Sequence, residues 1–325
     1  MNRSISIIIP NYNGKELLEA NLPSVYKALK SSDVSEFEII IPNDASTDSS
    51  VNFIKANYPD IILVRNEINK GFAGNTNTGI ERSHKDLVLI LNSDVKLTDN
   101  YFSQLLKYFD KPDTFGVTGR IVELDSDVIQ DGAKYPKYSF GNIASTTNYI
   151  CNTRSSLYNF FLTGANALID RKKLIELSGF NEIFNPYYGE DVDLGLRAWR
   201  LGYKCYYEHN AICRHPNSAT IKKESPEKIK IISSRNKMCL HFIHLNSFEQ
   251  TFYLIKLLIK TILKAIVLNL KYLKSFWMFI NSMNKCLSSK RRFRELQQAK
   301  NVHLSIKDVV TLINESNKDY QIEKF

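Results

Sequence analysis

The sequence predicts an α/β protein with a mostly parallel sheet, helices on both of its faces, and amphipathic helices at the C-terminus. Two patterns carry this prediction. In the first part of the chain short β-branched runs alternate with segments of helical periodicity, which is the order typical of a parallel sheet with crossover helices. From about residue 233 the chain becomes apolar with regularly spaced lysines, which indicates amphipathic helices.

Each element of the sheet follows from a local pattern. Pro10 ends the first run of isoleucines, and the turn-rich residues 43–48 precede a helix that begins near Ser49. After about residue 112 the pattern loosens, and residues 120–160 are expected to form a loop-bearing excursion. The expected strands are 4–9, 37–41, 61–64, 87–91 and 204–207, and the expected helices are 17–29, the one from residue 49, and 171–177.

Length and composition fit a globular protein and exclude several classes. The 325 residues are 43% hydrophobic and 24% charged, which is enough apolar content for a core and far from a collagen-like or disordered chain. The five cysteines are spread out without a CxxC pair, which favours a reducing compartment over a disulfide framework. Because the apolar residues 5–9 run into Pro10 without a basic segment or cleavage site, no secretion signal is expected.

The positive charge is concentrated in the C-terminal part of the chain. Residues 1–230 hold 27 Lys and Arg against 28 Asp and Glu, whereas residues 231–325 hold 16 against 6. This asymmetry predicts a near-neutral domain over 1–230 and a basic helical region over 231–325 with a different role. A basic region favours an anionic partner, and a lipid surface, nucleic acid and another protein are the candidates.

Regularly spaced lysines interrupt the apolar segment 252–270. At about 100° per residue five lysines fall in one narrow stripe of a single helix: Lys256, Lys260, Lys264, Lys271 and Lys274. A lysine at the centre of a membrane-spanning helix costs about 2.5–3.5 kcal/mol, so the stripe argues against a spanning segment. We therefore expect residues 250–294 to associate with an anionic membrane surface. The alternative is a helix packed on the protein body with its lysines outward.

Polar residues follow several of the predicted strands, where the ligands of parallel sheets bind. Asp94 comes directly after the strand at 87–91, and its carboxylate suits a divalent cation held against a diphosphate, although this pattern is also a common turn. His215 can serve as a nitrogen ligand, but a single histidine in a loop usually has no such role. Residues 69–79, rich in Gly and Asn, lead into a helix and can contact a phosphate or sugar.

Three carboxylates begin a predicted helix after the turn 186–189. Glu190 and Asp191 follow that turn and would leave an exposed acid at the mouth of a cleft, where it can serve as a general base. The alternative is that these acids only complement the helix dipole. Asp193 and Arg197, four residues apart, are expected to pair on the helix surface.

The order and spacing of these signals are more specific than any one of them. The series comprises residues 7–13, 43–48, 69–77, 92–94, 164–166, 179–182 and 189–193. It resembles family 2 glycosyltransferases over about residues 4–220, and most closely the bacterial rhamnosyltransferase-like branch. The resemblance implies a GT-A fold with a Rossmann-like sheet, a nucleotide-diphosphate sugar donor, a divalent metal ion (Mg²⁺ or Mn²⁺) and inversion at the anomeric carbon.

The resemblance also implies roles for individual residues. Asp191 matches the catalytic base of the Glu-Asp motif, with Glu190 beside it, and Asp94 matches the metal ligand of the DxD motif. His215 matches a late histidine that completes the metal site in several members. The residues that match nucleotide- and donor-binding positions are Pro10, Tyr12, Asn13, Asp44, Asn75, Asn77, Asn92, Ser93, Gly164 and Ala165.

The chain departs from the family pattern at three positions. Asn92 replaces the first Asp of DxD, which removes one charge from the metal site, although Asn is common there in this branch. Asn181 and Asn75 replace the usual Asp and Gly, which affects the identity of the donor more than the activity.

The expected function is an inverting glycosyltransferase that moves a sugar, from dTDP-rhamnose or a UDP-hexose, to a glycan acceptor in cell-surface polysaccharide biosynthesis. Asp191 takes the proton from an acceptor hydroxyl while the metal ion stabilises the charge on the departing nucleoside diphosphate. The basic C-terminal region leads us to expect a lipid-linked acceptor and a cytoplasmic location at the inner face of a bacterial-type membrane. Donor, acceptor and oligomeric state are left open by the sequence.

Three other functions fit the sequence less well. A sugar-nucleotide pyrophosphorylase requires a Gly-rich loop with Arg or Lys after the first strand, where this chain has Pro10-Asn-Tyr-Asn13. A nucleic-acid-binding protein would explain the basic region, but its lysines form one stripe without aromatic platforms, so no nucleic acid partner is expected. A catalytically inactive sugar-nucleotide-binding scaffold in a polysaccharide assembly complex stays open, and turnover is what distinguishes it.

Overall fold

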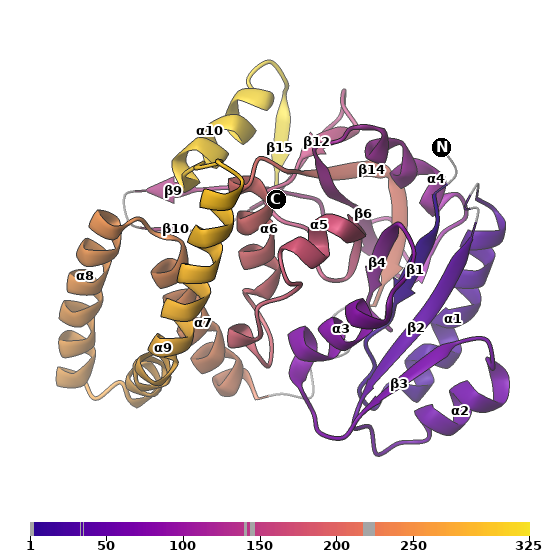
Figure 1. The fold of residues 1–325 in the computed structure, drawn as a ribbon, viewed down its shortest axis with the longest axis horizontal. Coiled ribbons are helices and arrows are strands. Elements are labelled where there is room, and N and C mark those ends of the chain that lie inside the picture. The colour runs from indigo at the N-terminus through magenta and orange to yellow at the C-terminus, as the bar shows by residue number, and fades with distance from the viewer. Residues whose placement is uncertain (1–2, 33, 35, 140–141, 144–146, 217–224) are drawn as a thin grey trace.

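A mixed sheet with the strand order β12-β14-β6-β13-β4-β1-β2-β3 forms the centre of the molecule, with helices on both faces (Figure 1). The predicted α/β class is confirmed, and the N-terminal half of the sheet is parallel throughout. That half consists of β1 (Ile5–Ile8), β2 (Phe37–Asp44), β3 (Ile62–Asn66) and β4 (Leu87–Leu91). The structure is a computed structural model, which describes residues 3–32, 34, 36–139, 142–143, 147–216 and 225–325.

The central strands β1 and β4 are buried along their whole length because both faces of the sheet are covered there. Alternate residues of each strand enter different cores: Ile7 and Leu89 face one core, whereas Ile8 and Ile90 face the other. The helices on the first side are α1 (Lys15–Lys30), α2 (Ser50–Asn57) and α4 (Tyr101–Leu106), and those on the second are α3 (Gly71–Arg82), α5 (Arg171–Glu176) and α6 (Glu190–Arg200).

The C-terminal half of the sheet differs from the sequence prediction. β13 (Asn166–Asp170) is antiparallel to both β4 and β6 (Thr114–Glu123). The strand expected at 204–207 is longer, because β14 (Lys204–His215) pairs with β6 along most of its length. His215 therefore ends a strand and does not lie in a loop. Other short elements here are β5 (Lys96–Leu97), η1 (Lys107–Asp110) and η2 (Glu182–Phe184).

The excursion expected at 120–160 contains strands, so its description as loop-bearing was incomplete. β11 (Thr147–Cys151) pairs with β8 (Ala133–Tyr135) on one side and with β15 (Ile322–Lys324) on the other. β15 lies far along the chain and cannot be recognised as a partner from local pattern. The strands of this region are β7 (Ile129–Asp131), β8 (Ala133–Tyr135), β9 (Tyr138–Ser139), β10 (Asn142–Ile143), β11 (Thr147–Cys151) and β12 (Ser156–Tyr158).

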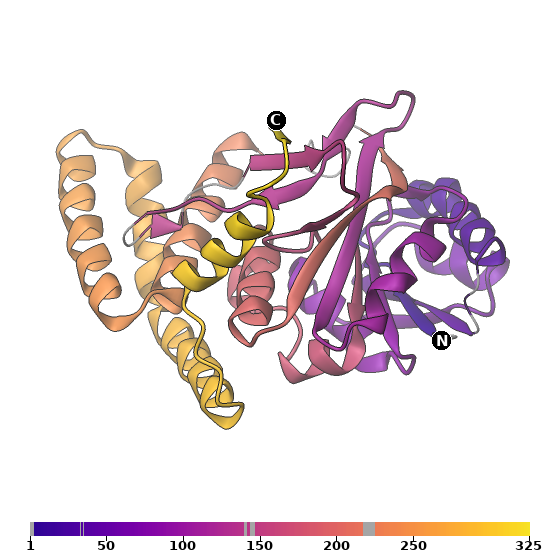
Figure 2. The same cartoon turned by 90° about the horizontal axis from the view of Figure 1, so that it is seen from above.

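Four helices follow: α7 (Pro226–His244), α8 (Ser247–Ile266), α9 (Leu270–Ala299) and α10 (Ile306–Ser316). The prediction that one helix carries all five lysines is wrong. α8 ends at Ile266, Leu268 adopts a left-handed conformation, and Asn269 caps α9 by accepting from the backbone N–H of Tyr272. Residue 230 lies inside α7, and all four helices contribute to the core that covers α6 (Figure 2).

Membrane-spanning helices were sought over the described part of the chain. No helix there combines the length and the apolar character needed to cross a bilayer.

Candidate active site

Polar side chains converge where β1 and β2 end. Asn11 is completely buried and donates from Nδ2 to Oδ1 of Asn43 at 2.7 Å and to Oγ of Ser50 at 3.1 Å. Asn13, with a left-handed backbone (φ 50°), accepts at Oδ1 from the backbone N–H of Thr47 at 2.8 Å. These bonds fix the two loops against each other. Asn11 belongs to a motif that the sequence analysis used, but it was not selected as a site residue.

Asp44 is buried at the end of β2 and binds the start of α3. Its Oδ1 accepts from the backbone N–H of Lys70 at 2.8 Å and from Nδ2 of Asn66 at 3.0 Å, and its Oδ2 accepts from the N–H of Gly71 at 3.0 Å. Gly71 has a φ of +70°, which turns its N–H toward the carboxylate and favours glycine. Asp44 is thus part of a rigid edge, since backbone donors occupy both of its oxygens.

Asn75 and Asn77 lie on the same helix but face different surroundings. Asn75 is buried in the Asp44 cluster, where it accepts from Asn66 at 2.9 Å and donates to the carbonyl of Pro42 at 3.0 Å. Asn77 instead bonds both backbone groups of Phe180, at 2.9 Å each. The structure brings Asn75 together with the predicted site and leaves Asn77 outside it. Residues 69–79 do not lead into a helix as expected, because α3 already begins at Gly71.

His215 lies against Asp94. The Nε2 of His215 is 3.4 Å from Oδ2 of Asp94, and only 4% of the surface of Asp94 is exposed. Nδ1 of His215 is 3.1 Å from Oε1 of Gln130, whose Nε2 donates to the His215 carbonyl at 3.1 Å. Because Oε1 is an acceptor, this contact favours the tautomer with the proton on Nδ1 and leaves the Nε2 lone pair toward Asp94.

This pair fits a divalent metal ion. A carboxylate oxygen and an imidazole nitrogen at that separation can both reach one ion with bonds of about 2.0–2.1 Å, and Mn²⁺ accepts mixed oxygen and nitrogen ligands. Among the residues that the structure describes there is no group of three or more His, Cys, Asp or Glu side chains that could hold a metal. A metal ion here would therefore need further oxygen ligands, which a diphosphate has.

The remaining donor-binding candidates lie on the loops after β1 and β4 and before β13. Asn92 donates its backbone N–H to the carbonyl of Ala165 at 3.0 Å, and the Ser93 carbonyl accepts from Nδ2 of Asn21 at 2.9 Å. Gly164 lies next to the ring of Phe72, which a Cβ would approach to 2.9 Å. Pro10 and Tyr12 precede Asn13, and the Tyr12 side chain is exposed.

Glu190 and Asp191 begin α6, after Gly189 in the left-handed region (φ 101°). The expectation of an exposed acid is wrong for Glu190, which is buried, whereas Asp191 is partly exposed. Burial, followed by the charge of Asp191, raises the pKa of Glu190 to about 8. Burial also raises the pKa of Asp191, and the bond from the Val192 N–H and the charge of Lys134 oppose that shift.

Lys134 links the Asp94–His215 pair to Asp191, and it was not selected from sequence. It pairs with Asp131 and donates from Nζ to Oδ1 of Asn148 at 2.8 Å. Asn148 donates to the carbonyl of Gln130 at 3.3 Å, and Gln130 contacts His215. Burial lowers the pKa of Lys134 to about 8, against the charge of Asp191. No local motif marks this lysine, because its partners come from separate short strands.

Asp193 and Arg197 do not form the surface pair that was expected. Both are buried, and Nε of Arg197 donates to Oδ2 of Asp193 at 2.8 Å. Arg197 also donates to the carbonyls of Leu177 and Gly179, at 2.5 and 2.9 Å. The pair therefore holds the turn after α5 against α6, which carries Asp191.

The chain is similar in sequence to known glycosyltransferases. The family model for glycosyl transferase family 2 matches residues 6–178, more than half of the chain. The O-antigen chain rhamnosyltransferase RfbN of Salmonella typhimurium is 27% identical over 225 residues, which are 68% of each chain. A GalNAc(5)-diNAcBac-PP-undecaprenol beta-1,3-glucosyltransferase of Campylobacter jejuni is 21% identical over 211 residues, 64% of this chain and 62% of the relative.

Solved structures with the GT-A fold superpose on almost the whole chain. GalNAc-T7 with UDP, GalNAc and Mn²⁺ gives a TM-score of 0.68 at 13% identity, over 98% of this chain and 58% of that one. The mannosyltransferase PcManGT of Pyrobaculum calidifontis, with GDP-Man and Mn²⁺, gives 0.53 at 15% identity, over 97% and 84%. The chain thus spans little more than half the length of the GalNAc-T7 structure. With its fold and the family match, the chain belongs to glycosyl transferase family 2.

Proposed function

We propose that the chain is an inverting, metal-dependent glycosyltransferase that moves a sugar from a nucleotide-diphosphate donor to a glycan acceptor in cell-surface polysaccharide biosynthesis. The observation that carries the proposal is the contact between Asp94 and His215, because two residues far apart in the sequence form an oxygen–nitrogen pair, and the loop that carries Asp94 bonds to Ala165. The naming of RfbN as an O-antigen chain rhamnosyltransferase supports dTDP-rhamnose as a donor, with a UDP-hexose as the alternative.

In this proposal Asp94 and His215 hold the metal ion, which supplies Lewis-acid stabilisation of the diphosphate leaving group. Gln130 keeps the His215 ring oriented. Tyr12 and Pro10 contact the nucleoside, while Asn13, Asp44 and Asn75 hold the surrounding loops in position. Asn92, Ser93, Gly164 and Ala165 line the donor sugar. Asn77 does not contact the donor in this proposal; it bonds to the backbone of Phe180.

Asp191 removes the proton from the acceptor hydroxyl. A base needs a pKa high enough to take the proton and must still be ionised at the working pH. Burial raises the pKa of Asp191, and the nearby charge of Lys134 keeps the ionised form accessible. Glu190, with a pKa of about 8, stays largely protonated at neutral pH, so a single negative charge faces the acceptor.

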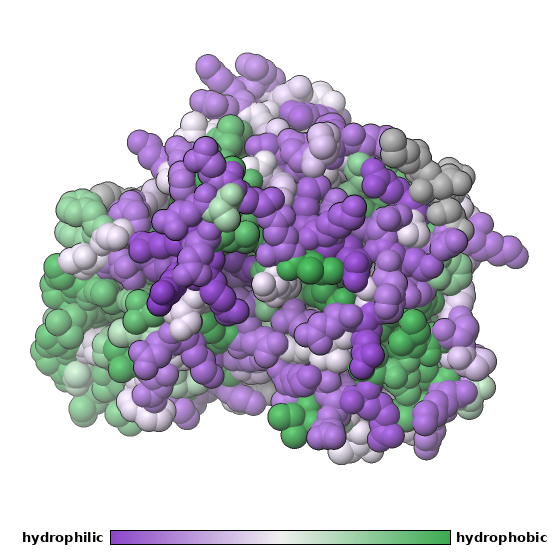
Figure 3. Space-filling view, viewed as in Figure 1, coloured by the Kyte–Doolittle hydropathy of each residue, from purple (hydrophilic) through white to green (hydrophobic). Residues whose placement is uncertain are grey.

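We further propose that α8 lies on an anionic membrane surface at the cytoplasmic side, where a lipid-linked acceptor would be found. Leu257 is the buried residue of this helix. Its lysines flank the apolar face, as at Lys256 and Lys260, which suits acidic headgroups. Figure 3 shows the apolar face over α8. At about 100° per residue the exposed apolar side chains span about 140° of the helix: Phe248, Phe252, Ile255, Leu258, Ile259, Ile262, Leu263 and Ile266.

A donor screen tests the proposed activity. Purified protein is incubated with Mn²⁺ or Mg²⁺ and a panel of UDP-, dTDP- and GDP-sugars, and release of nucleoside diphosphate is measured. We expect slow hydrolysis of one donor, lost with EDTA and in Asp94→Ala, and retained in Asp319→Ala, which removes an exposed aspartate far along the chain. Failure of every donor both to bind and to be hydrolysed would overturn the proposal.

A further inference from the structure

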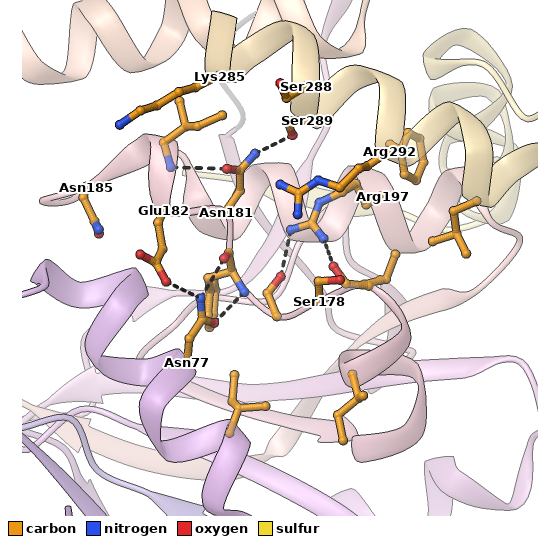
Figure 4. Close-up of a pocket in the computed structure, with 18 of the residues that line it drawn as sticks. Asn77, Ser178, Asn181, Glu182, Asn185, Arg197, Lys285, Ser288, Ser289 and Arg292 are labelled. Atoms are coloured by element: carbon orange, nitrogen blue, oxygen red, sulfur yellow. Dashed lines mark hydrogen bonds between the residues drawn. The ribbon is translucent and has the colours of Figure 1, made fainter.

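A cleft lies between α9 and the turn that joins α5 to η2 (Figure 4). Its volume is about 1390 Å³, larger than the ~300–1,000 Å³ of most small-molecule sites, so it has room for an extended ligand. Asp44, Asp94 and Asp191 do not line it. The cleft is therefore separate from the strand ends where the donor site is placed.

One wall of the cleft is a polar stripe of α9. Ser282, Lys285, Ser289 and Arg292 follow at intervals of three or four residues and, at about 100° per residue, lie within about 80° of one another. Lys285 and Arg292 are exposed, and within the described ranges of the chain neither has a carboxylate partner. In Figure 4 the guanidinium of Arg292 extends from α9 into the cleft.

A buried arginine, Arg235, lines the cleft. Only 7% of the surface of Arg235 is exposed, and its guanidinium donates to the carbonyls of Ile183 and Asn185. Its Nε has no hydrogen-bond partner, and no acid of the described residues forms an ion pair with it. Besides these carbonyls Arg235 contacts the Cys239 side chain, whose pKa its charge helps to lower. A buried cation without a carboxylate partner is costly, and an anion entering the cleft would lower that cost.

Three acids line the cleft, and one of them, Glu176, pairs with a cation. Glu176 pairs with Lys300 at 2.6 Å, and Glu182 accepts from Nδ2 of Asn77 at 3.2 Å. Glu81 is exposed at the rim. Among the described residues, Arg235, Lys285 and Arg292 outnumber Glu81 and Glu182, the two lining acids without a cation partner, so the cleft carries a net positive charge.

We propose that this cleft binds an anionic glycan, a saccharide chain that carries phosphate or carboxylate groups. The inference rests on the proposed function, since a glycosyltransferase of surface polysaccharides meets such a chain as its acceptor. Arginine binds phosphate and carboxylate groups through paired hydrogen bonds. The hydroxyls of Ser282, Ser288 and Ser289 on the same wall suit the hydroxyls of sugars.

The test is a binding titration by calorimetry on the full chain. The probes are tetragalacturonate, a carboxylated saccharide, maltotetraose, a neutral one, and inorganic phosphate. EDTA is present, so the result does not depend on donor turnover or on the metal. The variant is Lys285→Ala with Arg292→Ala. Its matched control is Lys274→Ala with Arg291→Ala, which removes one lysine and one arginine from the same helix outside the cleft.

We expect tetragalacturonate to bind the wild type and the control equally, and the Lys285→Ala, Arg292→Ala variant at least tenfold more weakly. Maltotetraose should bind at least tenfold more weakly than tetragalacturonate. Equal binding by both double variants, or no binding of tetragalacturonate, would overturn the proposal. Phosphate alone binding as tightly as tetragalacturonate would show an isolated anion site and overturn the assignment of a glycan. Because none of these outcomes involves hydrolysis, failure of the donor screen is distinguishable from failure here.

Discussion

The imidazole Nε2 of His244 is 2.8 Å from Oδ1 of Asp193, and both side chains are completely buried. The other oxygen of Asp193 accepts from Arg197, so one carboxylate joins α7 to α6 two residues beyond Asp191. Burial alone would raise the pKa of Asp193, but the charge of Arg197 and the bond with His244 outweigh it and lower that pKa. The helical C-terminal region is thereby fastened to the helix that carries the proposed base.

Asp193→Ala is predicted to lower the free energy of unfolding by about 3–5 kcal/mol, because it leaves the Arg197 charge buried without its partner. Urea unfolding followed by circular dichroism measures the loss. The exposed Asp319→Ala serves as the control and should change stability by less than about 0.5 kcal/mol. A similar small change for both variants would show that the buried pair does not fasten the two helices.

Gln130→Leu is predicted to weaken binding of Mn²⁺ by about 10–100-fold, since His215 loses the acceptor that orients its ring. The free and bound ion are distinguished by electron paramagnetic resonance, and the exposed Gln298→Leu is the control. Unchanged affinity in Gln130→Leu would show either that His215 is not a metal ligand or that Gln130 does not orient its ring.

Glu190→Gln is predicted to keep transfer activity at pH 7. The pKa of Glu190 is raised to about 8, so its carboxyl is already mostly protonated there and the substitution changes little charge. The pH profile of kcat/KM should still fall toward acid, as Asp191 becomes protonated. A variant without activity at pH 7 would assign Glu190 a role as an ionised group.

Lys134→Met is predicted to move the acidic limb of kcat/KM toward higher pH. Lys134 lowers the pKa of Asp191, so loss of its charge leaves the base protonated over a wider range. Melting temperatures check that the variant is folded, since Lys134 also pairs with Asp131. A uniform loss of activity without movement of the limb would indicate only a structural role.

Ile259→Glu with Leu263→Glu is predicted to abolish sedimentation with vesicles of phosphatidylglycerol and phosphatidylethanolamine. Both side chains are more than half exposed on the apolar face of α8, and a charge there opposes insertion. The control, Asn52→Glu with Ala56→Glu, adds the same charge to exposed positions of α2. Equal sedimentation of all three proteins would exclude α8 as the membrane contact.

Local pattern was sufficient for the parallel half of the sheet and for the ends of its strands. The apolar run Ile5–Ile8 and the polar residue Asn11 lie close together in the sequence. The strand and the loop that follows it were therefore recognisable together. The same holds for Asp94, which directly follows β4.

Features that depend on distant partners were missed. His215 was expected in a loop because the pairing of β14 with β6 is not visible in residues 204–215. Asp193 and Arg197 have the spacing of a surface pair, and only the packing of α7 onto α6 makes them buried. The break between α8 and α9 depends on Leu268 and Asn269, which the lysine periodicity concealed.

The most direct test of the proposed mechanism compares donor binding with transfer in Asp191→Asn. We expect the dissociation constant for the donor with Mn²⁺, measured by calorimetry, to be unchanged, because Asp191 acts on the acceptor. Transfer should fall by about 10²–10⁴-fold, the contribution of a positioned general base. Full transfer activity in Asp191→Asn, with donor binding intact, would exclude Asp191 as the catalytic base.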